Sequence, residues 1–189
     1  MRKSTLICTV TALIAGSAVA QTPPPPDPAK AQASRDGRHD FDWEFGTWTT
    51  RLRLLRNPLS GAAPDWADYQ GTSVVRPILD GRFNLVELSV SGTAGRIEGA
   101  ALRLYDPRSR QWSLNYANAR SGTLTTPVYG GFDDHGRGLF YAHDTLDGRA
   151  ILVRFVITAA AKEARFEQAY SADNRRSWGT NWIAVDTRQ

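Results

Sequence analysis

The chain has 189 residues and a formal net charge of +4, from 23 basic and 19 acidic side chains. This length is sufficient for one domain with a buried core. The small excess of positive charge gives no reason to expect binding to nucleic acid or to an anionic membrane. The single cysteine, Cys8, lies near the N-terminus, so the remaining chain has no thiol with which to form a disulfide.

The first twenty residues are typical of a secretory signal peptide. Arg2 and Lys3 precede an apolar run over residues 6–14, and residues 18–20 are the Ala-Val-Ala pattern of a cleavage site. The apolar run is too short to cross a bilayer as a stable helix. We therefore expect cleavage after residue 20, which leaves 21 basic and 19 acidic residues and a net charge of +2. The expected location is periplasmic or secreted, without stable membrane insertion.

Residues 21–38 are predicted to be a disordered linker. Four consecutive prolines at 23–26 favour an extended polyproline conformation, and the polar and small residues that follow show no periodicity. From residue 39 to residue 189 the pattern changes, and we expect a single folded domain there.

The folded part is predicted to begin with a short helical turn and to continue in strands. Residues 39–45 combine acids near a helix start with aromatic side chains on one side, as expected for a turn that plugs one end of a barrel. Turn signals such as Asp80-Gly81 and Asp147-Gly148 separate the strand candidates. The candidates are 47–55, 68–76, 83–91, 97–105, 111–118, 137–143, 151–157, 165–171 and 178–187, with a weaker one at 127–132.

The two ends of this domain favour a closed barrel over a sandwich. Gly46 and Trp48 open the first strand, and Arg188 closes the last one. In a closed barrel the first and last strands are neighbours, so the arginine can lie across the tryptophan ring. We predict an all-β fold, an antiparallel closed β-barrel of about 8–10 strands, whose interior suggests a ligand.

Polar residues alternate with apolar ones in several strands and are the candidate ligand contacts. Successive side chains of a strand point to opposite faces, so a polar residue shares its face with residues two positions away. Buried charges are costly unless they are paired, so inward-facing polar residues would form a network or line a wet cavity. The candidate ligand-binding residues are Glu87, Arg103, Asn115, Arg154, Glu167 and Asn181.

Which face points inward stays open at this stage. If 151–157 and 165–171 form a hairpin centred near residues 160–161, Arg154 and Glu167 are directly opposed and form an ion pair. The alternative is that these polar faces are exposed and that the opposite, more apolar faces form the core. That core would contain Trp48/Thr50/Leu52/Leu54, Trp112/Leu114/Tyr116, Ile151/Val153/Phe155/Ile157 and Phe166/Gln168/Tyr170.

Motifs for catalysis or metal binding are weak. The three histidines, His39, His135 and His143, lack zinc-ligand spacing, so no metal site is predicted. No cofactor is predicted either, although His143 offers a subsidiary hypothesis as an axial haem ligand. The sequence has no nucleophile elbow and no phosphate-binding glycine loop. Residues 171–178 resemble a degenerate Asp-box turn, which indicates a β-hairpin.

Four stretches of the domain resemble a known family. These are His39 to Trp48, Tyr69 to Arg76, Gly99 to Asn115 and Arg165 to Trp182, and together they resemble the DUF1579-like group of exported bacterial proteins of unknown function. The resemblance covers residues 39–188 and implies a lipocalin-like (calycin) β-barrel. It implies no catalytic residues.

Three functions follow as hypotheses. The leading one is binding or carriage of a small, partly apolar molecule that also has a polar group. The second is a cofactor-free isomerase, cyclase or hydrolase that uses a carboxylate in the barrel, either Glu87 or Glu167. The third is a structural envelope protein with no ligand, in which the polar cluster only supports the fold.

Overall fold

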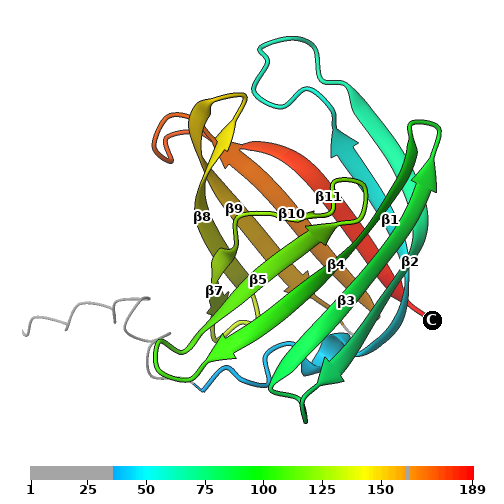
Figure 1. Ribbon diagram of the computed structural model, residues 1–189, viewed down its shortest axis with the longest axis vertical. Coiled ribbons are helices and arrows are strands. Elements are labelled where there is room, and N and C mark those ends of the chain that lie inside the picture. Colours follow the sequence, from blue (N-terminus) through cyan, green and yellow to red (C-terminus); the bar gives the residue numbers. More distant parts are fainter. Residues whose placement is uncertain (1–35, 161) are drawn as a thin grey trace, which may run out of the picture.

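The computed structural model describes residues 36–160 and 162–189. The signal peptide expected over residues 1–20, and all of the expected linker except residues 36–38, lie outside this range. The described chain begins with a 3₁₀ turn, η1 (Asp42–Glu44), followed by strands (Figure 1). The strands are β1 (Gly46–Leu55), β2 (Trp66–Ile78), β3 (Phe83–Gly92), β4 (Gly95–Asp106), β5 (Gln111–Asn118), β6 (Thr123–Leu124), β7 (Val128–Phe132), β8 (Gly138–Leu146), β9 (Arg149–Ala159), β10 (Glu163–Ser171) and β11 (Gly179–Arg188).

Ten of these strands close into one antiparallel barrel. The order runs from β1 through β5 to β7 and on to β11, and β11 pairs with β1 to complete the ring. The two-residue β6 pairs only with the end of β5. The predicted all-β closed barrel is confirmed, and the strand predictions agree with the structure to within a few residues. Among the described residues, no helix is long and apolar enough to cross a membrane.

The contact expected at the barrel seam is present. The guanidinium of Arg188 lies 4.3 Å from the centre of the Trp48 ring. It also donates hydrogen bonds to the carbonyl oxygens of Phe45, at 2.9 Å, and Trp43. Arg188 therefore ties the last strand both to the first strand and to the η1 segment.

The strands alternate between an inward apolar row and an outward polar row. On β1, Trp48, Thr50 and Leu52 are buried, whereas Thr49 and Arg51 between them are exposed. On β5, β9 and β10 the rows that contain Leu114, Phe155 and Phe166 line the interior, so the more apolar rows of these strands face inward. Of the two arrangements considered from the sequence, the one in which the more apolar faces of the strands form the core is thus correct.

The η1 segment closes the lower end of the barrel in Figure 1. Phe41 is fully buried, and its ring meets Trp112 and Phe132 edge-on, each at 4.9 Å between centroids. The indole nitrogen of Trp112 donates to the carbonyl oxygen of Gly37 at 2.9 Å, which holds the start of the segment against β5. The predicted plug is confirmed, and it seals this end with an aromatic cluster.

A β-bulge interrupts the regular alternation near the other end. The register between β10 and β11 shifts after Gln168, so that Trp182 pairs with Gln168 while Thr180 pairs with Ala169. Asn181 is the extra residue of the bulge. An extra residue reverses the side to which the chain points, and Asn181 becomes buried, accepting a hydrogen bond from Gln168 at 3.0 Å.

Candidate functional site

A cavity of about 160 Å³ lies inside the barrel above the plug. Its walls are mostly apolar side chains from the inward rows, and its floor comes from η1. The apolar lining consists of Trp43, Val86, Leu88, Ala101, Leu114, Phe155, Ile157, Ala164, Phe166, Trp182 and Ala184. A mostly apolar concave site with a few polar groups is the usual form of a small-molecule site.

An ion pair forms the floor of the cavity. Arg103 of β4 and Glu44 of η1 make a two-pronged contact, in which Nη2 donates to Oε1 at 3.2 Å and Nη1 donates to Oε2. Only 7% of the Arg103 side chain and 13% of the Glu44 side chain are exposed. The Arg103 guanidinium also lies 4.2 Å from the centre of the Phe41 ring. The positive charge of Arg103 is therefore matched within the protein.

A second polar group lies on the wall formed by β1, β2 and β11. Thr50 donates a hydrogen bond to Oδ1 of Asp186, and the hydroxyl oxygens of Thr50 and Ser73 are 2.7 Å apart. All three residues line the cavity. Burial raises the pKa of Asp186 to about 6, assisted by the negative charge of Glu44 and opposed by the Thr50 hydrogen bond and the charge of Arg103.

Tyr116 on β5 offers a polar atom without a partner. Its hydroxyl is buried and makes no hydrogen bond within the described chain, and burial raises its pKa. The hydroxyl lies where a side chain at Gly99 would be, since a Cβ there would come within 2.3 Å of it. Gly99 therefore makes room for the end of a tyrosine that lines the cavity.

The cavity reaches solvent beside the short strand β6. β5 pairs with β7 only over Trp112–Leu114, and its last residues pair with β6 instead. The segment 119–127 fills the wall there, and its exposed Thr125 and Thr126 line the cavity. This is a side of the barrel where regular strand pairing does not seal the interior.

The structure places two of the six predicted site residues in the interior. Arg103 shares the inward face of β4 with Ala101 and Tyr105, as predicted. Asn181 is buried through the bulge, although Ile183 and Val185, with which it was grouped, face outward. Asn181 therefore lies in the interior because of the bulge, and not because of the strand alternation from which its position was predicted.

The other four predicted residues face outward, which corrects their assignment to the interior. Glu87 is about half exposed and pairs with Arg76 at 2.5 Å. Glu167 pairs with Arg165, whose Nε lies 2.7 Å from the carboxylate. Asn115 donates to the carbonyl oxygen of Leu102 at 3.1 Å across the outer face. None of these side chains lines the cavity.

The predicted Arg154–Glu167 ion pair is wrong because the hairpin register differs. Arg154 is opposite Ala169, and Glu167 is opposite Val156. The loop between β9 and β10 is centred about one residue later than expected, which moves the partners by two positions. Arg154 instead stacks on Trp178, with 4.4 Å between its guanidinium carbon and the ring centre.

The Asp-box-like turn that carries Trp178 is built around Asp173. Its carboxylate accepts hydrogen bonds from the Ser171 hydroxyl at 2.9 Å and from the Ser177 hydroxyl at 2.6 Å. These bonds, that of Ser177 foremost, lower the pKa of Asp173 to about 2. The turn is structural, as predicted, and lays Trp178 over the outside of the barrel.

The histidines do not reach the cavity. His143 is exposed on the outer face of β8, His135 lies in the turn before β8, and His39 bonds to Asp42 at 2.8 Å. The geometry for an axial haem ligand inside the barrel is therefore missing at His143. Within residues 36–160 and 162–189, no group of three or more His, Cys, Asp or Glu side chains is arranged to hold a metal ion.

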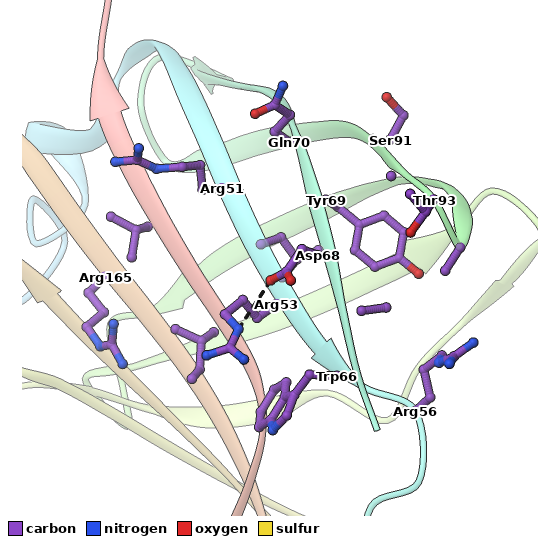
Figure 2. A pocket seen from close by; sticks show the side chains of 16 residues that line it. Arg51, Arg53, Arg56, Trp66, Asp68, Tyr69, Gln70, Ser91, Thr93 and Arg165 are labelled. Carbon is purple, nitrogen blue, oxygen red and sulfur yellow. Dashed lines mark ion pairs between the residues drawn. The ribbon is translucent and has the colours of Figure 1, made fainter. Parts of the chain in front are cut away.

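A larger depression on the outer surface, about 970 Å³ in volume, is a poorer candidate. Figure 2 shows Arg51 and Arg53 on β1, Trp66 at the start of β2, and Arg56 on the loop that joins these two strands. Arg53 pairs with Asp68 at 3.2 Å, and Arg56 pairs with Asp65 at 2.6 Å. Ion pairs that are exposed to solvent contribute little free energy, and Arg53 and Arg56 are already paired within the protein, so we place the site in the interior.

The sequence reasoning missed the polar wall of the cavity. Thr50 was assigned to an apolar core row, and Ser73, Glu44 and Asp186 were not selected. The sequence did contain a signal for Asp186, because Asp186 shares one face of the last strand with Ala184 and Trp182. A single Asp near a chain end is ordinarily solvent-exposed, so alternation alone did not distinguish it.

The fold and the site define the chain as a ten-strand closed antiparallel β-barrel with an interior cavity. No protein-family model and no curated protein matches it. The solved structures that are similar to it include the following two. EF1p2_mFAP2b bound to DFHBI is 11% identical, with coverage of 81% of this chain and 99% of that chain and a TM-score of 0.44. A second barrel, a fluorescence-activating one designed de novo, is 13% identical, with coverage of 82% and 99% and a TM-score of 0.40. The resemblance to the DUF1579-like group stays an expectation from sequence.

Proposed function

We propose that this protein binds a compact, largely apolar small molecule inside the barrel. The supporting observation is the cavity of about 160 Å³, which has apolar walls and one polar side. An apolar cavity of roughly 150 Å³ accommodates benzene. The ligand is therefore of the size of a single substituted ring unless the segment 119–127 moves outward.

A matched pair of alanines tests this proposal. Ala101 lines the cavity, whereas its neighbour Ala100 lies on the outer face of β4. Ala101→Phe fills the space, and Ala100→Phe adds the same side chain outside. With benzyl alcohol as the probe, calorimetry should show at least a tenfold loss of affinity for Ala101→Phe and unchanged affinity for Ala100→Phe.

Equal affinity in both variants would contradict interior binding, as would failure of the unmodified chain to bind at millimolar probe concentrations. Circular dichroism shows whether Ala101→Phe keeps its fold. Arg154→Ala provides a second control. Because Arg154 stacks on Trp178 outside the barrel, its removal should leave the affinity unchanged.

Two alternatives have weaker support. Glu87 and Glu167, the carboxylates first considered for a cofactor-free enzyme, lie outside, so acid–base chemistry would have to use Asp186. A carboxyl group with a raised pKa in a cavity is compatible with such chemistry, but among the described residues its side-chain hydrogen-bond partner is the hydroxyl of Thr50, and no second acid–base group is bonded to it. A purely structural role would favour a filled interior, which the cavity argues against.

We also propose that the protein is exported to the periplasm or secreted. The support is the charged start, apolar run and Ala-Val-Ala pattern within residues 1–20. N-terminal sequencing of protein recovered from the producing cell should give Gln21 as the first residue. Recovery of the chain with Arg2 and Lys3 still present in the bulk of the protein would refute cleavage.

A further inference from the structure

The hydrogen bonds of the polar wall determine what a ligand must supply. Thr50 uses its single hydroxyl hydrogen in the bond to Oδ1 of Asp186. The short contact between Thr50 and Ser73 therefore requires Ser73 to donate to Thr50. Both hydroxyl hydrogens are then used within the protein, and Ser73 presents only oxygen lone pairs to the cavity.

Asp186 adds further acceptor capacity. An ionised carboxylate accepts about four hydrogen bonds, and the described chain supplies one side-chain bond, from Thr50. The second oxygen, Oδ2, has no side-chain partner among the described residues. This wall of the cavity is thus rich in acceptors, and a complementary ligand has to be a hydrogen-bond donor at this point.

The charged groups around Asp186 also disfavour an anionic ligand. The groups that face it are Thr50 on β1, Ala164 on β10, Glu44 on η1 and Arg103 on β4. The charges of Arg103 and Glu44 cancel in their ion pair. Arg165, which also lines the cavity, is paired with Glu167. When Asp186 is ionised, it is therefore a cavity carboxylate for which no ion pair with a described residue is found, and an anionic ligand would be repelled by it.

We propose that the cavity selects compact apolar molecules that carry a protonated amine, with the ammonium group bound by Asp186 and Ser73. This inference rests on the interior binding function proposed above and adds the chemical class of the ligand. An ammonium group has three N–H donors and no acceptor, which matches the wall. Pairing with the carboxylate offsets the cost of removing the cation from water, and the hydrocarbon body contacts the apolar walls.

Three probes of the same shape test the proposal on the full chain. Benzylamine, benzyl alcohol and benzoate share a ring and differ in the polar group. At pH 7.5, calorimetry should show benzylamine binding at least tenfold more tightly than benzyl alcohol and benzoate not binding measurably. The affinity for benzylamine should fall below pH 6 as Asp186 takes up a proton, and that for benzyl alcohol should not change.

Asp186→Asn is the decisive variant, because it keeps the shape of the side chain and removes its charge. It should abolish the preference for benzylamine over benzyl alcohol, whereas Asp68→Asn on the outer face should change neither affinity. Circular dichroism shows whether Asp186→Asn keeps its fold.

The outcomes separate the two proposals. Benzyl alcohol binding without any preference for benzylamine would overturn the amine selectivity and leave the interior site intact. A preference that persists in Asp186→Asn would overturn it as well. Absence of binding by all three probes would overturn the interior site and, with it, the ligand class.

Discussion

At the scale of single residues, Asp186 determines the chemistry of the cavity, and the burial of its charged carboxylate destabilises the folded protein. Its pKa is 3.8 in an unperturbed carboxyl group and about 6 in the folded protein. Between these values the folded protein holds a proton that the unfolded chain has released. The free energy of unfolding therefore decreases as the pH rises from 3.8 to 6.

Asp186→Asn should remove this dependence. An amide oxygen still accepts the Thr50 hydrogen bond, and no charge remains to be buried. We expect the variant to be more stable than the unmodified protein at pH 7, by up to about 3 kcal/mol, with no difference near pH 4. Urea unfolding at both pH values measures this, and identical pH profiles for the two proteins would be inconsistent with a buried, titrating Asp186.

Arg103 and Glu44 should behave as one unit. Arg103→Met leaves the Glu44 carboxylate buried without its partner, and such a loss costs about 3–5 kcal/mol. Adding Glu44→Gln removes the unpaired charge and should recover most of the lost stability. A double-mutant cycle by denaturant unfolding provides the test, and strictly additive effects would show that the two residues act independently.

At the scale of elements, the η1 segment closes the lower end of the barrel in Figure 1 through one aromatic anchor. Phe41→Ala leaves a void among Trp112, Phe132 and Phe140, and truncation of a buried Phe costs about 3–5 kcal/mol. Leu79→Ala, in an exposed turn at the same end, should have little effect. A small effect at Phe41, similar to that at Leu79, would mean that the plug does not stabilise the barrel.

The positions of the strands could be predicted from the sequence. The face of the sheet to which each side chain points could be predicted only in part. Turn residues and alternation located the strands, because both signals are local. The inward face depends on strand register and on the bulge at Asn181, which is set by pairing with β10. Two of the six candidate site residues therefore lie in the interior, Asn181 only because of the bulge, and Asp186 was missed because its burial depends on closure by β1.

At the scale of the whole molecule, the pairing of β1 with β11 closes the sheet into a barrel that encloses the cavity. Arg188 contributes a stacking contact on Trp48 and two charged hydrogen bonds to the plug. Arg188→Ala should lower the free energy of unfolding by about 2 kcal/mol. It should also accelerate hydrogen exchange in β1 and β11 more than in β8 and β9.

Arg188→Lys should recover only part of the loss, because an ammonium group lacks the planar fork that stacks and reaches both carbonyls. Hydrogen-exchange mass spectrometry distinguishes local from uniform destabilisation. Equal acceleration in all strands would argue against a specific role of Arg188 in closure.

The central claim is that a small molecule binds inside this barrel and not on its surface. Methyl NMR spectra recorded during a titration with benzyl alcohol test it most directly, because β11 presents Ala184 to the cavity and its neighbours Ile183 and Val185 to the outer surface. The account predicts shifts at Ala184, Leu114 and Ile157, with Ile183 and Val185 almost unchanged. Shifts confined to Ile183 and Val185, or no shifts at all, would contradict it.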